Sequence, residues 1–83
     1  MMMTVRVQFW SYFKDLAGSA EIAATLADGA TIADLLKDVY TRFPKLAAAE
    51  KSTLIAVGVD YQPRNHRLQD GDEVSLFPPV SGG

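Results

Sequence analysis

The sequence predicts an α+β fold in which one amphipathic helix packs against one β-sheet. Apolar and polar residues alternate over residues 4–9 and again over residues 21–26, which is typical of half-buried strands. Between residues 32 and 43 the apolar residues instead follow the i, i+3, i+4, i+7 spacing of a helix. With 83 residues the chain has room for one domain only. The predicted order is β-β-α-β-(β)-β.

The first strand directs Val5, Val7 and Phe9 to one face. Trp10 breaks this alternation, because a large aromatic residue stands where a polar one is expected. Residues 11–18 are predicted to form a short connecting turn that ends at Gly18. The second strand follows, so the first two strands are expected to pair across a longish hairpin loop.

The helix has clear start and stop signals. Thr31 is a favourable N-cap residue, and Asp34 stands where the partner of a capping box is found. Pro44 disfavours helical geometry at Phe43 and is expected to end the helix.

The remainder of the chain predicts mostly sheet. Residues 45–53 are expected to form a loop or a loose helical turn, residues 54–59 a buried strand, and residues 61–67 an edge strand or a loop. Asp70, Gly71 and Asp72 predict a turn into a last strand at residues 73–77. We therefore expect a domain over residues 1–77 and an extended tail over residues 78–83.

Composition excludes several classes of function. The net charge is −2 and the basic residues are scattered, which argues against nucleic-acid binding. The chain has no cysteine, which removes thiol catalysis and is consistent with a reducing cytoplasm. No apolar run approaches the roughly 20 residues that a membrane span needs. Phosphate-binding, dinucleotide-binding and hydrolase motifs are absent from the sequence.

Titratable residues give no catalytic or metal-binding pattern. His66 lies in a polar stretch and is expected at the surface. Asp70, Asp72 and Glu73 lack the spacing of a calcium loop and are better explained as a turn before a strand. The sequence therefore predicts no metal site, and an enzyme acting alone from this chain is not expected.

Two aromatic residues fall outside the core pattern of their strands. Trp10 and Phe77 would form one apolar patch if the first and last strands are central neighbours. Such patches mark partner surfaces. The alternative is that the helix or a loop covers one of the two rings.

The tail is the strongest functional signal. Pro78 and Pro79 restrict φ and favour a stiff exit from the sheet. Gly82 and Gly83 lack Cβ and fit a channel too narrow for other residues. These features predict a carboxylate that can be delivered into another protein's active site, where activation as an acyl-adenylate would make it electrophilic. The alternative is a frayed terminus.

Residues 68–83, together with residues 5–10 and 14–18, resemble the small subunit of molybdopterin synthase, the MoaD-like sulfur carriers. The resemblance covers the whole chain, and the ending DGDEV…PPVSGG is its most specific part. It implies a ubiquitin-like β-grasp fold, with a mixed sheet of four to five strands on one main helix. Two positions depart from the family: Lys14 stands where Arg is frequent and Gly58 where Asn is common.

The resemblance also implies the chemistry. An E1-like adenylating enzyme would use ATP to activate Gly83, a sulfur donor enzyme would convert it to a thiocarboxylate, and the chain itself would bind no cofactor. The sulfur would then pass to cyclic pyranopterin monophosphate in the large subunit, within a heterotetramer. By the same resemblance Phe77 and the stem that follows it lie in the partner interface; the stem consists of Pro78, Pro79, Val80 and Ser81. The apolar patch described above adds Trp10 to this interface.

Two other functions agree with a Gly-Gly ending. One is a sulfur carrier of another pathway, such as the thiamine type, which usually lacks the Pro-Pro-Val stem. The other is a ubiquitin-like modifier that is joined to lysines of target proteins.

Overall fold

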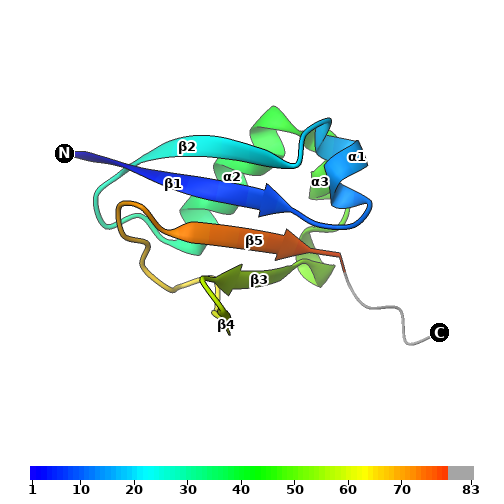
Figure 1. Cartoon of the computed structure of the whole chain (residues 1–83). Helices are drawn as coiled ribbons and strands as arrows, with labels where there is room; N and C mark the ends of the chain where they lie inside the picture. The colour runs from blue at the N-terminus through cyan, green and yellow to red at the C-terminus, as the bar shows by residue number, and fades with distance from the viewer. Residues whose placement is uncertain (79–83) are drawn as a thin grey trace.

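A computed structural model describes residues 1–78 and shows one mixed sheet with a helix packed on one of its faces (Figure 1). The sheet has five strands in the order β2-β1-β5-β3-β4. The strands are β1 (Met2–Phe9), β2 (Glu21–Ala27), β3 (Leu54–Val57), β4 (Asp60–Tyr61) and β5 (Glu73–Phe77). The helices are α1 (Phe13–Ala17), α2 (Ile32–Arg42), α3 (Pro44–Ala47) and the short 3-10 helix η1 (Glu50–Ser52). The predicted α+β class is confirmed.

The topology brings the first and last strands together at the centre of the sheet. β1 pairs with β2 in antiparallel fashion, as predicted, and with β5 in parallel. β3 is antiparallel to both β5 and β4. Because β1 and β5 are parallel, their carboxyl ends lie at the same edge of the molecule.

Strand alternation builds the core. Val5, Val7 and Phe9 are buried on the α2 side of β1, whereas the residues between them face away from the helix. From α2 the predicted stripe supplies buried residues to the same layer. They are Ile32, Leu35, Leu36 and Val39.

Both predicted ends of α2 are present. The Thr31 hydroxyl accepts a hydrogen bond from the Asp34 N–H, and the Asp34 carboxylate accepts one from the Thr31 N–H at 2.9 Å, which completes the capping box. The helix ends at Arg42, with Phe43 as its C-cap ahead of Pro44. The carbonyl of His66 accepts from the Ile32 N–H, which fixes the long 62–68 loop against the helix start.

Residues 11–18 differ from the predicted turn, because residues 13–17 form α1. Ser11 has a positive φ of 57°, and this sharp bend lets the chain turn back so that Phe13 enters the core. Gly18, with φ of 72°, ends the helix as expected. α1 has only five residues, too few for an apolar pattern to distinguish a short helix from a loop.

The strand expected at residues 54–59 is shorter than predicted. β3 ends at Val57, and Gly58 and Val59 form the turn into β4. Gly58 has φ of 63°, which glycine adopts without strain, and Val59 is 95% exposed instead of buried. The predicted strand is therefore too long by two residues, because an apolar residue in a turn gives the same sequence pattern as one inside a strand.

Three further predictions, for residues 45–53, 61–67 and 70–72, were closer. Residues 45–53 contain the short α3 and η1, in line with a loose helical turn. For residues 61–67 the prediction was an edge strand or a loop: the edge strand β4 includes only Tyr61 of this stretch, and residues 62–67 lie in the loop after it. The turn at residues 70–72 leads into β5 as predicted.

Candidate docking surface beside the C-terminal tail

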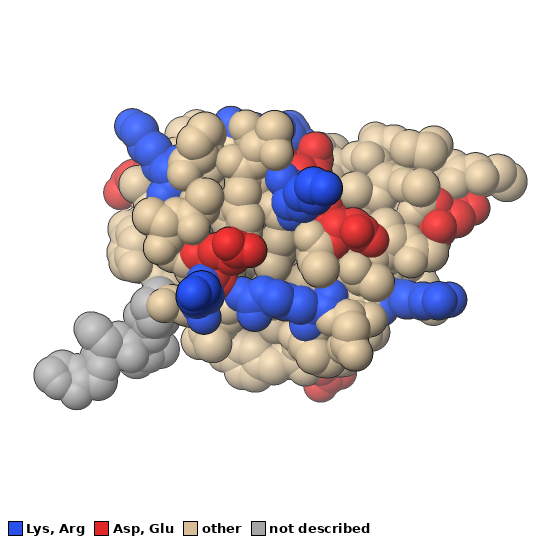
Figure 2. All heavy atoms as spheres, turned by 180° about the vertical axis from the view of Figure 1, so that it is seen from behind, with Lys and Arg blue, Asp and Glu red and all other residues tan. Residues whose placement is uncertain are grey.

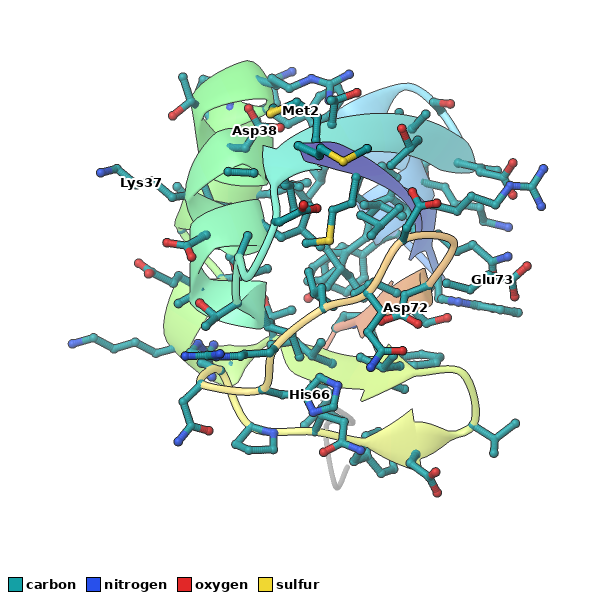
Figure 3. The ribbon with its side chains drawn as sticks, turned by 90° about the vertical axis from the view of Figure 1, so that its left-hand side faces the viewer. Met2, Lys37, Asp38, His66, Asp72 and Glu73 are labelled. Atoms are coloured by element: carbon teal, nitrogen blue, oxygen red, sulfur yellow. The ribbon has the colours of Figure 1, made fainter. Side chains whose placement is uncertain are left out.

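The face of the sheet opposite α2, which we call the open face, carries charged side chains at its centre. Arg6 on β1 forms ion pairs of 3.6 Å with Glu21 on β2 and with Glu73 on β5. Figure 3 shows Glu73 on the side of the sheet away from α2, whereas Lys37 extends from the outer side of the helix. These exposed pairs contribute little to stability, about 0–1 kcal/mol each. Their main consequence is that the part of the open face that carries Arg6, Glu21 and Glu73 is polar.

The other half of the open face carries three aromatic rings, which we call the aromatic cluster. Trp10 and Phe77 stack with 5.6 Å between ring centroids and an interplanar angle of 18°. Tyr61 meets Phe77 edge-on at 6.4 Å and 64°. The rings come from the residue after β1, from the end of β5 and from β4, so the cluster crosses the sheet.

Strand register places the first two rings side by side. Phe9 is the partner of Leu76 in the parallel pair, and both side chains point into the core. The next residue on each strand, Trp10 or Phe77, therefore points to the open face. The Trp10 N–H also donates to the Leu76 carbonyl at 3.1 Å, which holds the two strand ends together. Leu54, opposite Phe77 in β3, adds an aliphatic side chain that is 38% exposed.

The predicted contact between Trp10 and Phe77 is confirmed. The alternative, in which a helix or loop covers one of the rings, does not hold among residues 1–78, since Trp10 is 46% exposed and Phe77 is partly exposed. Exposed aromatic rings gathered in one place are the composition of interface centres. The role of these residues in partner binding stays a prediction.

Sequence reasoning missed Tyr61. It was assigned to a stretch of edge strand or loop because Pro63, Asn65 and His66 follow it closely. In the structure Tyr61 is the strand partner of Ala56 and is 70% exposed on the open face. One feature of the sequence could have indicated its place. Tyr61 follows the end of the apolar β3 by four positions, which is close enough for a tight turn to pair it with that strand.

The tail begins beside this cluster. Pro78 follows Phe77 directly and is partly buried. Pro79, Val80, Ser81, Gly82 and Gly83, which the sequence assigned to the stem and the reactive end, lie outside the described residues. Any segment that continues from Pro78 therefore starts next to the aromatic cluster.

The acidic turn has a structural role. The Asp70 carboxylate accepts from the Thr4 N–H at 2.8 Å, and the Asp72 carboxylate accepts from the Gln69 N–H at 2.8 Å. These bonds tie the turn to β1 and close it on itself. Within residues 1–78 there is no group of three or more His, Cys, Asp or Glu side chains that would hold a metal ion.

The remaining surface has a different character. Seen from behind the sheet, Lys and Arg are interspersed with Asp and Glu (Figure 2). His66, labelled in Figure 3, lies in the loop after β4 and is partly exposed. In the described part of the chain, no helix has the length and apolar character needed to cross a membrane.

The fold defines a class, the small ubiquitin-like β-grasp domains, in which a mixed sheet packs on one main helix. A ubiquitin from Caldiarchaeum subterraneum has the same fold, with a TM-score of 0.70 at 17% identity over 100% of both chains. A "Putative molybdopterin converting factor, subunit 1" from Pyrococcus furiosus superposes with a TM-score of 0.86 at 31% identity, over 94% of this chain and 99% of that one.

The sequence comparison gives the family. The model described as "ThiS family" matches residues 7–83, and this chain belongs to that family. The "Molybdopterin synthase sulfur carrier subunit" of Chlamydomonas reinhardtii is 35% identical over 83 residues, covering 98% of this chain and 100% of the relative. "Small archaeal modifier protein 3" of Haloferax volcanii is 31% identical over 97 residues, covering 98% of this chain and 100% of the relative.

A solved complex is also similar to this chain. It is described as the "protein-protein complex of subunit 1 and 2 of Molybdopterin-converting factor" from Helicobacter pylori. The chain compared has a TM-score of 0.67 and 26% identity, over 98% of this chain and 100% of that one.

Proposed function

We propose that this chain is the sulfur carrier subunit of a molybdopterin synthase, and that it carries sulfur on the carboxyl group of Gly83. The observation that supports this most directly is the exposed aromatic cluster of Trp10, Phe77 and Tyr61 immediately before Pro78. A docking surface at the base of a Gly-Gly tail suits a protein that must dock firmly while its terminus enters a partner. The similarity to named sulfur carrier subunits supports the same function.

The proposed reaction has three steps. In an E1-like adenylating enzyme the Gly83 carboxylate attacks the α-phosphorus of ATP, and pyrophosphate leaves. A sulfur donor enzyme then supplies hydrosulfide, whose sulfur attacks the acyl carbon, displaces AMP and leaves a thiocarboxylate. In the large subunit this sulfur is transferred to cyclic pyranopterin monophosphate, and water restores the carboxylate oxygen.

This chain's own residues contribute position rather than catalysis. The open face docks through the aromatic cluster, and the restricted φ of Pro78 and Pro79 is expected to favour a stiff stem. Because Gly82 and Gly83 have no side chains, the last two residues fit a narrow channel. ATP and the pterin bind to the partners in this proposal, so the chain needs no cofactor of its own.

The large subunit is the partner with the most support. The Helicobacter pylori complex pairs subunit 1, a protein of this size and fold, with subunit 2. We extend that pairing to this chain, with two copies of each subunit in a heterotetramer. The adenylating enzyme and the sulfur donor are further partners of the proposal.

A protein modifier is the second candidate. The similarity to "Small archaeal modifier protein 3" favours it, because a modifier also needs an activated terminal glycine. In that case the amine of a target lysine would attack the acyl carbon of the Gly83 adenylate. An isopeptide bond would form, and AMP would leave.

Intact-mass measurement separates the two functions. The chain is incubated with ATP, an adenylating enzyme and a sulfur donor, in the presence and absence of cell extract. A sulfur carrier gains the mass difference of one sulfur for one oxygen, whereas a modifier forms isopeptide-linked ladders. A chain whose mass is unchanged, and which keeps its cellular function after deletion of Gly82 and Gly83, would contradict both.

A further inference from the structure

A pocket of about 230 Å³ lies next to the aromatic cluster, and of its lining residues the function described above uses only Trp10. It lies between the end of β1, α1 and the start of β2. Its lining comes from all three segments and consists of Gln8, Phe9, Trp10, Lys14, Ala20 and Glu21.

The size of this pocket indicates what it can hold. Small-molecule sites usually enclose about 300–1,000 Å³, so this pocket is smaller than an ordinary ligand site. A single side chain from a docked protein is the better match. Hot-spot side chains of this kind insert into pockets near the centre of an interface.

The position of Trp10 relates the pocket to the aromatic cluster. In the sheet order β2-β1-β5-β3-β4, Phe77 stacks on Trp10 from the β5 side, whereas the pocket lies on the β2 side. Trp10 therefore contacts Phe77 toward β5 and borders the pocket toward β2. A group that fills the pocket would extend the row of rings Tyr61, Phe77 and Trp10 by one more member.

The chemistry of the lining favours an aromatic occupant. Most of the exposed pocket wall is apolar. Of its charged residues, Glu21 pairs with Arg6 at 3.6 Å, and its carboxylate would repel an acidic side chain. Lys14 in turn would repel a guanidinium or ammonium group. A ring that stacks on the indole satisfies the apolar wall and opposes neither charge.

We propose that this pocket receives an aromatic side chain of the large subunit, as an anchor beside the aromatic cluster. This inference rests on the proposed function, because that function supplies the partner. It adds a second contact region on the β2 side of Trp10, formed by α1 and the start of β2.

The test fills the pocket without changing the cluster or the tail. Ala20 is exposed, and its backbone carbonyl accepts from the Phe9 N–H at 2.9 Å, a bond that a side-chain change retains. Ala20→Leu is compared with Ala27→Leu, the same change at an exposed position at the far end of β2. Calorimetry with the purified large subunit gives Kd for each variant. We expect Ala20→Leu to weaken binding by about tenfold or more, and Ala27→Leu to leave it unchanged.

A second variant and a spectroscopic readout identify the occupant. Lys14→Glu should change Kd by less than about threefold if the occupant is an uncharged ring. Trp10 is the one tryptophan of the chain, so the labelled chain gives a single set of indole signals. A ring stacked on the indole should shift these proton signals upfield when the large subunit binds.

Each remaining outcome overturns a defined statement. Unchanged binding by Ala20→Leu, with weaker binding by Phe77→Ala, would overturn the pocket inference and leave the proposed function intact. Loss of binding by Lys14→Glu as large as that by Ala20→Leu, without an upfield shift, would overturn the aromatic occupant in favour of a carboxylate. If the wild-type chain fails to bind any large subunit, the proposed function itself is wrong.

Discussion

Replacing Trp10 with Ala separates the docking role of the aromatic cluster from any role in stability. Trp10 is 46% exposed, so truncating its side chain removes fewer packing contacts than truncating a fully buried one would. Its stack on Phe77 is worth about 0.5–1.5 kcal/mol, and we expect the free energy of unfolding to fall by about 1–2 kcal/mol. Domains of this length have about 4–12 kcal/mol of stability, so the variant remains folded.

Binding should respond much more strongly. An aromatic residue at an interface centre costs about 2 kcal/mol or more when truncated, which is roughly a 30-fold increase in Kd for the large subunit. Such an increase cannot arise from a minor unfolded fraction.

Calorimetry on the purified complex measures the affinity, and urea unfolding of the free chain measures the stability. Met2→Ala is the control, since Met2 is also an exposed apolar residue, 62% exposed, but lies at the opposite end of β1 from the cluster. The docking role would be refuted if Trp10→Ala binds within about threefold of wild type, or if Met2→Ala weakens binding equally.

Three further substitutions test the fold that positions the site, each by urea unfolding of the free chain. Thr31→Ala removes the hydroxyl of the capping box and should cost about 0.5–2 kcal/mol, whereas Thr31→Ser should cost much less; equal losses would argue against the cap. Leu76→Ala leaves a cavity in the core, because Leu76 is 1% exposed on the strand between β1 and β3; it should lower the free energy of unfolding by about 2–5 kcal/mol. A decrease below about 1 kcal/mol would contradict its place in the core. Gly58→Ala should cost about 1–2 kcal/mol because φ is 63° while the space around an added Cβ is open, and Gly58→Asn should cost less; identical costs would point to a steric cause.

The parts of the fold that sequence predicted well depend on local signals. The limits of α2 follow from Thr31, Asp34 and Pro44, all within or beside the helix itself. The pairing of Trp10 with Phe77 was also accessible, because each ring breaks the alternation of its own strand.

The parts that sequence missed depend on contacts between distant segments. β4 has only two residues, Asp60 and Tyr61, too few for an alternating pattern to appear. Tyr61 joins the cluster only because β3 pairs with both β4 and β5. The pocket likewise needs α1 to fold back between β1 and β2, and the bend at Ser11 that makes this possible has no signature in a serine.

Gly58 stands at a position for which the resemblance described above gives asparagine. The turn after β3 has a positive φ of 63° at this residue, and asparagine and glycine both tolerate a positive φ better than other residues. The backbone of this turn is therefore compatible with either residue.

The central claim is tested most directly by one single-turnover measurement. The chain is prepared with a thiocarboxylate at Gly83 and mixed with the large subunit and cyclic pyranopterin monophosphate, and the masses of chain and pterin are followed together. We predict that each sulfur gained by the pterin matches one thiocarboxylate that returns to carboxylate, and that a variant with one residue added after Gly83 cannot be charged. A sulfurated pterin with the thiocarboxylate still intact, or a consumed thiocarboxylate with no sulfur on the pterin, would contradict the proposed function.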